Sequence, residues 1–142
     1  MIVLDTNVLS ETMRPKPARQ VMAWLDSLTP HQVFMSSPTQ AEILLGIELM
    51  PDGKRRAELT QKVAALLTGF FENRCLPFDA QATPHFARIV ASRRKAGKPI
   101  SAEDAQIAAI AVSRGYRVAT RNVADFAGVV GLDIVNPWDF VS

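Results

Sequence analysis

Short apolar segments alternate along this 142-residue chain with longer segments that have helical patterns. The first apolar run is Ile2, Val3 and Leu4, and further strand-like segments follow at residues 33–35, 76–78, 116–120 and 133–135. Short runs that are apolar throughout are typical of parallel strands covered by helices on both faces. Repeated alternation with right-handed crossovers therefore predicts an α/β fold, with a central parallel sheet of about five strands flanked by helices.

The segments between the predicted strands have the spacing and end signals of helices. We expect helices over residues 18–28, 39–50, 55–73, 84–96 and 101–115, and a shorter one soon after Leu4. The stretch from Ala105 to Val112 is apolar except for Gln106, so this helix should be buried on most sides. Because no repeat, low-complexity tract or second domain is visible, residues 1–142 are predicted to form a single domain.

Composition and charge exclude several classes of protein. Sixteen Lys and Arg against fourteen Asp and Glu give a net charge of +2, which alone does not indicate a nucleic-acid binder. A single cysteine, Cys75, and two distant histidines leave neither a disulfide framework nor a zinc ligand set, so any metal needs oxygen ligands. No apolar run approaches the roughly 18 residues of a membrane span, and we expect a cytoplasmic protein without membrane contact. Basic residues cluster at 14–19, 54–56 and 93–98, where they could face phosphates or solvent.

Three acidic residues occupy equivalent places relative to the predicted strands and helices. Asp5 directly follows the first strand, and Glu42 is expected in the first turn of the helix after the second strand. Asp104 is expected in the first turn of the buried helix. Strand ends and helix starts meet at one edge of a parallel sheet, so these carboxylates can converge although they are distant in sequence. Asp125, a few residues beyond the fourth strand, can join them there.

Each acid also has a purely structural explanation. Asp5 could cap the following helix. Thr39 and Glu42 have the spacing of a capping box, and Ser101 and Asp104 have that of its Asp variant. Convergence would separate the explanations, because clustered carboxylates raise each other's pKa unless a cation is present. A cluster of oxygen ligands suits Mg²⁺ or Mn²⁺, and the chemistry it implies is metal-assisted phosphodiester hydrolysis.

Four segments, IVLDTNVLSE, TQAEILLGI, ISAEDAQIAAIA and ATRNVADF, occur in this order along the chain. Together they resemble the motifs of the PIN-domain ribonucleases, and most closely the VapBC-type toxins with their FitB-like branch. The resemblance spans nearly the whole chain and implies a single PIN-like domain. It also implies an endoribonuclease toxin that uses Mg²⁺, or Mn²⁺ as a substitute, to hydrolyse RNA. Such toxins are neutralised by a cognate antitoxin, are commonly homodimers, and contact DNA only through the antitoxin.

The same resemblance assigns roles to individual residues. Asp5, Glu42 and Asp104 stand at the family's first three acidic positions, and Asp5 and Asp104 are the implied metal ligands. Many relatives carry a fourth acid two residues after the Thr of the last motif. This chain has Asn122 there and Asp125 three residues later, and we take Asp125 as the fourth catalytic residue. Asn122 remains an alternative, because its carbonyl oxygen can coordinate a metal although it brings no charge.

Two other functions are compatible with an α/β chain of this kind. A non-catalytic PIN-fold binding protein would need none of the three acids that this chain retains. A phosphoacceptor signalling domain would use Asp79, after the third strand, as its acceptor. That reading requires an early acidic pair and a late Lys, whereas Thr6 follows Asp5 and Thr120 ends the fourth strand. Thr120 could instead orient a water or phosphate, or simply form a strand-end turn.

Overall fold

The computed structural model describes residues 1–141, and this part of the chain forms one parallel sheet of five strands with seven α-helices. The strand order is β3-β2-β1-β4-β5, and every neighbouring pair is parallel. The strands are β1 (Ile2–Leu4), β2 (Val33–Ser36), β3 (Cys75–Leu76), β4 (Arg117–Ala119) and β5 (Ile134–Val135). The predicted α/β class and five-stranded parallel sheet are confirmed.

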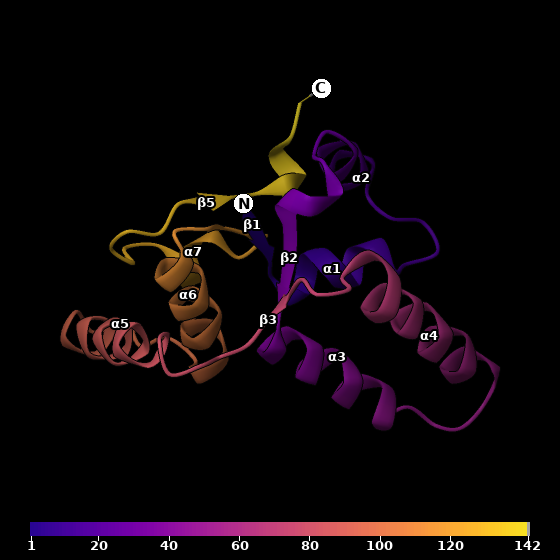
Figure 1. The fold of residues 1–142 in the computed structure, drawn as a ribbon, viewed down its shortest axis with the longest axis horizontal. Helices are drawn as coiled ribbons and strands as arrows, with labels where there is room; N and C mark the ends of the chain where they lie inside the picture. Colours follow the sequence, from indigo (N-terminus) through magenta and orange to yellow (C-terminus); the bar gives the residue numbers. More distant parts are fainter. Residues whose placement is uncertain (142) are drawn as a thin grey trace.

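Helices lie on both sides of the sheet and beyond one of its ends. They are α1 (Thr6–Thr12), α2 (Arg19–Asp26), α3 (Ser37–Glu48), α4 (Lys54–Ala65), α5 (Thr83–Lys95), α6 (Ala102–Arg114) and α7 (Val123–Phe126). Figure 1 shows α5 and α6 on one side of the central strands, and α1, α2 and α4 on the other. None of the helices within residues 1–141 is both long and apolar enough to span a bilayer.

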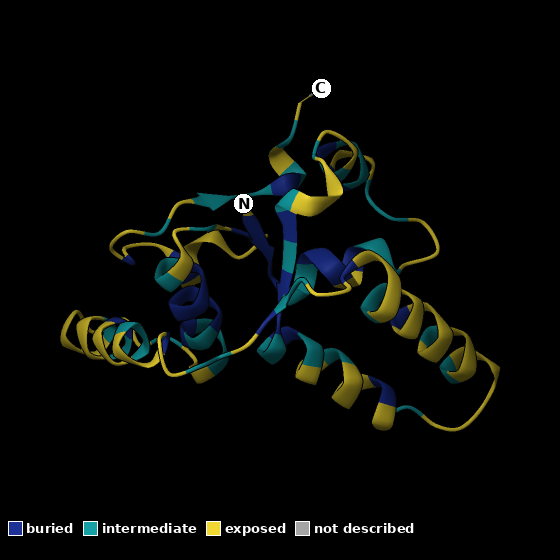
Figure 2. Ribbon diagram, viewed as in Figure 1, coloured by how far each residue is buried: buried dark blue, intermediate teal, exposed yellow. Residues whose placement is uncertain are grey.

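Alternating side chains of the strands supply two separate cores. Val3 and Val118 pack with α5 and α6, whereas Ile2 and Leu4 pack with α1 and α2 on the opposite face. The short apolar strands therefore reflect burial on both faces. Figure 2 shows that many of the buried residues lie in the central strands and α6, while α4 and α5 are largely exposed.

The buried helix is confirmed as α6. Its residues from Ile107 to Ala111 are all buried, and Ala105 is buried as well. The helix ends at Gly115, which has φ of +71° and therefore takes the left-handed conformation that other residues adopt at a cost. The predicted position of α6 thus holds at both ends.

The predicted start of α3 is wrong by two residues. Ser36 is the N-cap, its side chain accepts from the Thr39 backbone N–H at 3.4 Å, and Pro38 lies in the first turn. Proline suits this place because the first N–H groups of a helix have no intrahelical partner. Glu42 therefore lies in the second turn, and the capping box that was the structural alternative for Thr39 and Glu42 does not form.

The predicted helix over residues 55–73 is also too long. Helix α4 ends at Ala65 and continues as one π-helical turn, Leu66–Phe70, in which the Phe71 N–H donates to the Leu66 carbonyl at 2.8 Å. Phe71 is buried in the core beside α1 and α2. The wider turn is local backbone geometry that side-chain periodicity does not encode.

The order of the strands places a topological switch point beside β1. The chain adds β2 and β3 on one side of β1, and then returns to add β4 and β5 on the other side. In open α/β sheets, ligands bind outside the carboxyl ends of the strands at such a point. Asp5 follows β1 and Thr120 follows β4, so both lie at this switch point.

Candidate active site

Asp5 is buried at the switch point and is held by three hydrogen-bond donors. Its Oδ1 accepts from the Thr6 backbone N–H at 2.8 Å, which makes Asp5 the N-cap of α1. Its Oδ2 accepts from the Thr120 hydroxyl at 2.7 Å and from the Asn7 side-chain amide at 3.3 Å. Asp5 therefore caps the helix with one oxygen, while the other takes part in a network that spans β1 and β4.

Thr120 and Asn7 extend this network into the loop after β4. The buried Thr120 hydroxyl also accepts from the Asn122 backbone N–H at 3.0 Å. The Asn7 side-chain oxygen accepts from the Arg121 backbone N–H at 3.3 Å. Thr120 thus fixes both the Asp5 carboxylate and the start of the segment that carries Asn122 and Asp125.

A second chain of hydroxyl groups links β2 to α1. The Thr39 hydroxyl oxygen accepts from Thr6 Oγ1 at 3.1 Å and from Ser36 Oγ at 3.3 Å. Ser36 and Thr39 are both fully buried. These contacts join the starts of α1 and α3, the helices that present Asp5 and Glu42 at the same edge of the sheet.

The start of α6 brings two further acids to this edge. Ser101 is the N-cap, and its hydroxyl accepts from the Asp104 backbone N–H at 3.1 Å. Glu103 and Asp104 both lie in the first turn of α6. The expected cap at Ser101 and the expected place of Asp104 are confirmed. Helix α6 also contributes Glu103, an acid that was not among the predicted site residues.

The charges of Glu42 and Asp125 act on both Asp5 and Asp104, so the four predicted acids are electrostatic neighbours. Burial raises the pKa of Asp5, hydrogen bonds from Thr120 and Thr6 oppose this rise, and the charges of Glu42 and Asp125 add to it. The pKa of Asp104 is also raised, first by burial and then by the charge of Asp5. Carboxylates that raise each other's pKa are expected in one convergent cluster and not among unrelated helix caps.

Glu103 is the member of this cluster that the sequence interpretation missed. Burial, a hydrogen bond shared with Glu42, and the charges of Glu42, Asp104 and Asp5 raise its pKa to about 8. Its Oε1 atom is buried and has no hydrogen-bond partner within the described residues. The sequence does contain a sign of Glu103. Glu103 and Asp104 are consecutive acids in the first turn of one helix, so both are expected at the same edge of the sheet.

The chemistry of these side chains suits a hard divalent cation. The cluster offers only oxygen donors, and a bound cation would offset the repulsion that adds to the effect of burial on the carboxyl pKa values. Within residues 1–141, no three His, Cys, Asp or Glu side chains are already close enough to hold one ion. The acids are electrostatic neighbours, but among the described residues they do not form a ready-made ligand set.

The two candidates for the fourth position lie on neighbouring parts of one segment. Asn122 precedes α7 and its side chain makes no cap hydrogen bond, while Asp125 lies within α7. Both residues are exposed. Asp125 acts electrostatically on Asp5 and on Asp104, which places its charge within reach of the cluster.

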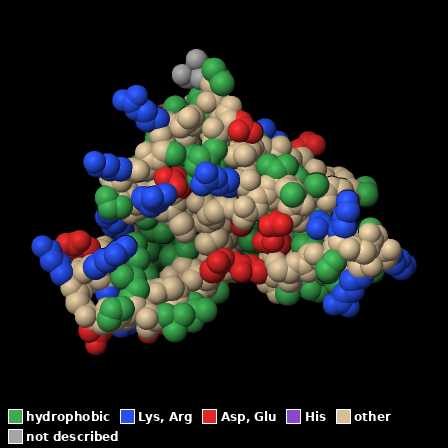
Figure 3. Space-filling view, turned by 180° about the vertical axis from the view of Figure 1, so that it is seen from behind, with side chains coloured by type: hydrophobic (Ala, Val, Ile, Leu, Met, Phe, Trp, Pro, Cys, Tyr) green, Lys and Arg blue, Asp and Glu red, His purple; other side chains and the backbone are tan. Residues whose placement is uncertain are grey.

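A cleft of about 940 Å³ opens beside the acidic cluster. Its walls come from α1, the loop after α1, α3 and α4, and Thr6 and Glu42 lie where it meets the cluster. The walls are apolar over most of their area. Besides Glu42 they carry one further acid, Glu58, and three cationic side chains: Arg14, Arg55 and Lys62. Figure 3 shows acidic side chains near the centre of one face, with Lys and Arg side chains toward both sides.

Asp79, the acceptor of the phosphoacceptor alternative, lies elsewhere. It follows β3, which is an edge strand of the sheet, and its Oδ1 accepts from the Ala82 backbone N–H at 3.2 Å. Its other oxygen lies 3.9 Å from Arg114. Asp79 thus has structural partners away from the switch point, which argues against a phosphoacceptor function.

Comparison with known families agrees with this geometry. The PIN domain family matches residues 2–130, so the chain belongs to the PIN domain family. Within that family it is 41% identical to the VapC ribonuclease Y4jK of Sinorhizobium fredii and 40% identical to the toxin FitB of Neisseria gonorrhoeae. These alignments cover 98% and 97% of this chain, and 99% of each relative.

Solved structures show the same likeness over the whole chain. The chain superimposes on a structure of FitAB bound to an IR36 DNA fragment with a TM-score of 0.91 and 39% identity. This match covers 100% of the present chain and 99% of the matched one. The resemblance inferred from four short motifs is therefore confirmed for sequence and fold.

Proposed function

We propose that this protein is a divalent-metal-dependent endoribonuclease that acts as the toxin of a VapBC-type toxin–antitoxin pair. The observation that carries the proposal is the convergence of Asp5, Glu42 and Asp104 at the topological switch point, where Asp5 and Asp104 have raised pKa values. Relatives at 40% and 41% identity are named as a toxin and as a ribonuclease, which supports both parts of the proposal.

Asp5 and Asp104 are the proposed ligands of Mg²⁺, or of Mn²⁺ in its place. Glu42 and Asp125 complete the catalytic set by adding negative charge around the same position. A bound divalent ion would lower the pKa of a water molecule and neutralise charge on the phosphate. The protein must hold its metal ligands in position. For Asp5, the hydrogen bonds from Thr120, Thr6 and Asn7 would do so.

The cleft beside Glu42 is the proposed approach of the RNA strand. Arg14, Arg55 and Lys62 can neutralise backbone phosphates, while the apolar wall can contact bases. Arg14 is oriented by the buried Glu11, whose Oε1 lies 3.2 Å from the Arg14 Nη1. Arg14, Arg55 and Lys62 would then line the path of the RNA toward the acidic cluster.

The proposed partners follow from the matched toxin–antitoxin structures. A cognate antitoxin would neutralise the toxin, and DNA would be contacted only through the antitoxin. One matched structure is of FitAB bound to a DNA fragment, which supports a toxin–antitoxin complex that binds DNA. A cytoplasmic location follows from the proposed RNA substrate. We also propose a homodimer, because two neighbouring apolar side chains are exposed, Leu45 on α3 and Leu49 directly after its end.

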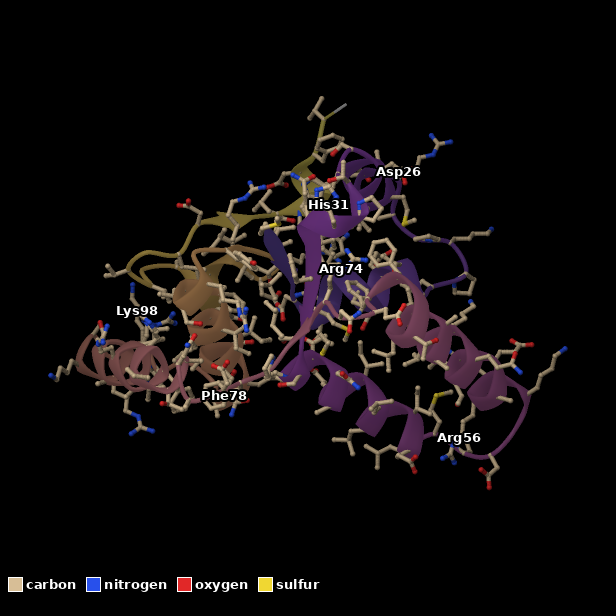
Figure 4. The ribbon with its side chains drawn as sticks, viewed as in Figure 1. Asp26, His31, Arg56, Arg74, Phe78 and Lys98 are labelled. Carbon is tan, nitrogen blue, oxygen red and sulfur yellow. The ribbon has the colours of Figure 1, made fainter. Side chains whose placement is uncertain are left out.

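RNA cleavage by the purified protein tests the enzymatic part. The parent should cleave bulk cellular RNA in the presence of Mn²⁺ and should lose this activity in EDTA, while Asp5→Asn should be inactive but folded. Asp26→Asn is the matched control, because Asp26 is an exposed acid on α2, away from the acidic cluster (Figure 4). RNA binding by the parent without Mn²⁺-dependent cleavage would favour the non-catalytic binding protein instead.

A further inference from the structure

Arg93, in the last turn of α5, bridges two segments that are distant in sequence. Its Nε donates to the Lys98 carbonyl at 2.7 Å. Its Nη1 donates to the Asp125 carbonyl at 2.8 Å and to the Ala127 carbonyl at 3.3 Å. A guanidinium can make all three bonds because its donors form a fixed planar fork.

The first of these segments is the loop between α5 and α6, where Lys98 lies (Figure 4). The Lys98 backbone N–H donates back to the Arg93 carbonyl at 2.9 Å, so the two residues exchange a pair of hydrogen bonds. Gly97, with φ of +72°, permits the tight turn between them. Three residues later Ser101 caps α6 and fixes the backbone of Asp104.

The second segment is α7 and the residue that follows it. A helix of four residues leaves most of its carbonyl groups without intrahelical partners, and Arg93 satisfies two carbonyls at its end. A cation is also favoured at a helix C-terminus. The start of α7 is bound through Asn122 to Thr120, and its buried Phe126 packs in the core.

We propose that Arg93 is a positioning residue that holds the segment leading to Asp104 and the segment carrying Asp125 at a fixed separation. The two carboxylates have like charge and lie close enough to act on each other, so their repulsion tends to separate the two segments. Arg93 opposes this movement without contacting the acids, because it binds only backbone carbonyl groups. The assignment rests on the proposed function insofar as these acids form a metal site.

Hydrogen–deuterium exchange in EDTA tests the holding role without any metal or RNA. Arg93→Ala should speed exchange of the amides at residues 125–129 by about tenfold, as expected for the loss of one charge-assisted hydrogen bond. Arg93→Lys keeps the charge but not the fork and should resemble Arg93→Ala. Arg94→Ala is the matched control, because Arg94 is the adjacent exposed residue of the same helix, and it should exchange like the parent.

Calorimetric titration with Mn²⁺, well below the melting temperature, tests whether this holding serves the acidic cluster. Arg93→Ala should raise the Mn²⁺ dissociation constant by about tenfold or more, as loss of supporting contacts does at metal sites. Equal exchange in Arg93→Ala and Arg94→Ala overturns the proposal, and so does faster exchange with Mn²⁺ affinity equal to the parent's. A parent that binds no Mn²⁺ contradicts the proposed function, while the exchange result still decides the holding role of Arg93.

Discussion

At the scale of single residues, opposing effects act on the charge of Asp5. Hydrogen-bond donors favour the charged carboxylate, whereas burial and neighbouring acids disfavour it. Thr120 and the Thr6 backbone donate to it, whereas burial and the neighbouring acids raise its pKa. Hydrogen bonds can orient a carboxylate but cannot remove repulsion from other carboxylates. The cluster thus costs stability when no cation is present, as functional sites often do.

The pH dependence of stability follows from these shifts. The pKa of Glu103 rises from 4.5 to about 8 on folding, so the folded state binds the proton more tightly than the unfolded state. Stability should therefore fall as pH rises from about 4.5 to about 8 in EDTA. Thermal melting across this window should show the decline in the parent and a smaller decline in Glu103→Gln. An equal decline in both proteins would mean that Glu103 is not the group responsible.

Asp125 and Asn122 can be separated by kinetics. If Asp125 supplies charge to the metal site, Asp125→Asn should lower the single-turnover cleavage rate by about tenfold or more and change RNA affinity little. RNA affinity depends mainly on cations that meet phosphates. Asn122→Asp should leave Mn²⁺ affinity unchanged or make it tighter. Normal cleavage by Asp125→Asn together with inactive Asn122→Ala would make Asn122 the fourth site residue.

Sequence alone predicts those site residues that lie next to the end of a strand or the start of a helix. Asp5 follows an apolar strand and Asp104 follows a capping Ser, so both could be placed from local patterns. Glu103 was missed because local patterns do not reveal that its side chain meets Glu42 from another helix. The role of Thr120 as a donor to Asp5 likewise depends on the pairing of β1 with β4.

At the scale of elements, α3 connects the buried hydroxyl groups of the site to the apolar surface and to the cleft. Ser36 and Thr39 are buried at its start, Glu42 and Gly46 line the cleft, and Leu49 is exposed after its end. Strands β1 and β2 and helix α6 were predictable because each contains a clear apolar run. The start of α3 was not, because the expected helix begins after Pro38, although proline is tolerated in a first turn.

Gly46 offers a stability test within α3. A Cβ atom at this position would meet no heavy atom within 4 Å, and the residue lies inside a helix. Gly46→Ala should therefore stabilise the protein by about 0.4–1 kcal/mol, because the unfolded chain loses conformational freedom. Gly115→Ala is the contrasting variant, since φ of +71° should make it cost about 1–2 kcal/mol. Chemical denaturation measures both, and a destabilised Gly46→Ala would contradict this description of α3.

At the scale of the whole molecule, two exposed leucines, Leu45 on α3 and Leu49 just after it, favour association with a second copy. Leu45 and Leu49 are 57% and 76% exposed, and burying them in a homodimer would remove this apolar surface from water. The double variant Leu45→Glu, Leu49→Glu should sediment as a monomer, whereas the parent should sediment as a dimer. Val130→Glu is the control, because Val130 is 89% exposed in the loop after α7 and should not affect the dimer. A parent that sediments as a monomer would contradict the homodimer.

The most direct test of the account is the thermal stability of the protein with and without a divalent ion. If Asp5 and Asp104 bind Mn²⁺, a free concentration about 100-fold above the dissociation constant should stabilise the folded state by about 2.7 kcal/mol. NaCl at equal ionic strength should not reproduce the rise in melting temperature, and the double variant Asp5→Asn, Asp104→Asn should not show it. A parent that does not respond to Mn²⁺, or a double variant that responds as the parent does, would contradict a metal site between Asp5, at the end of β1, and Asp104, at the start of α6.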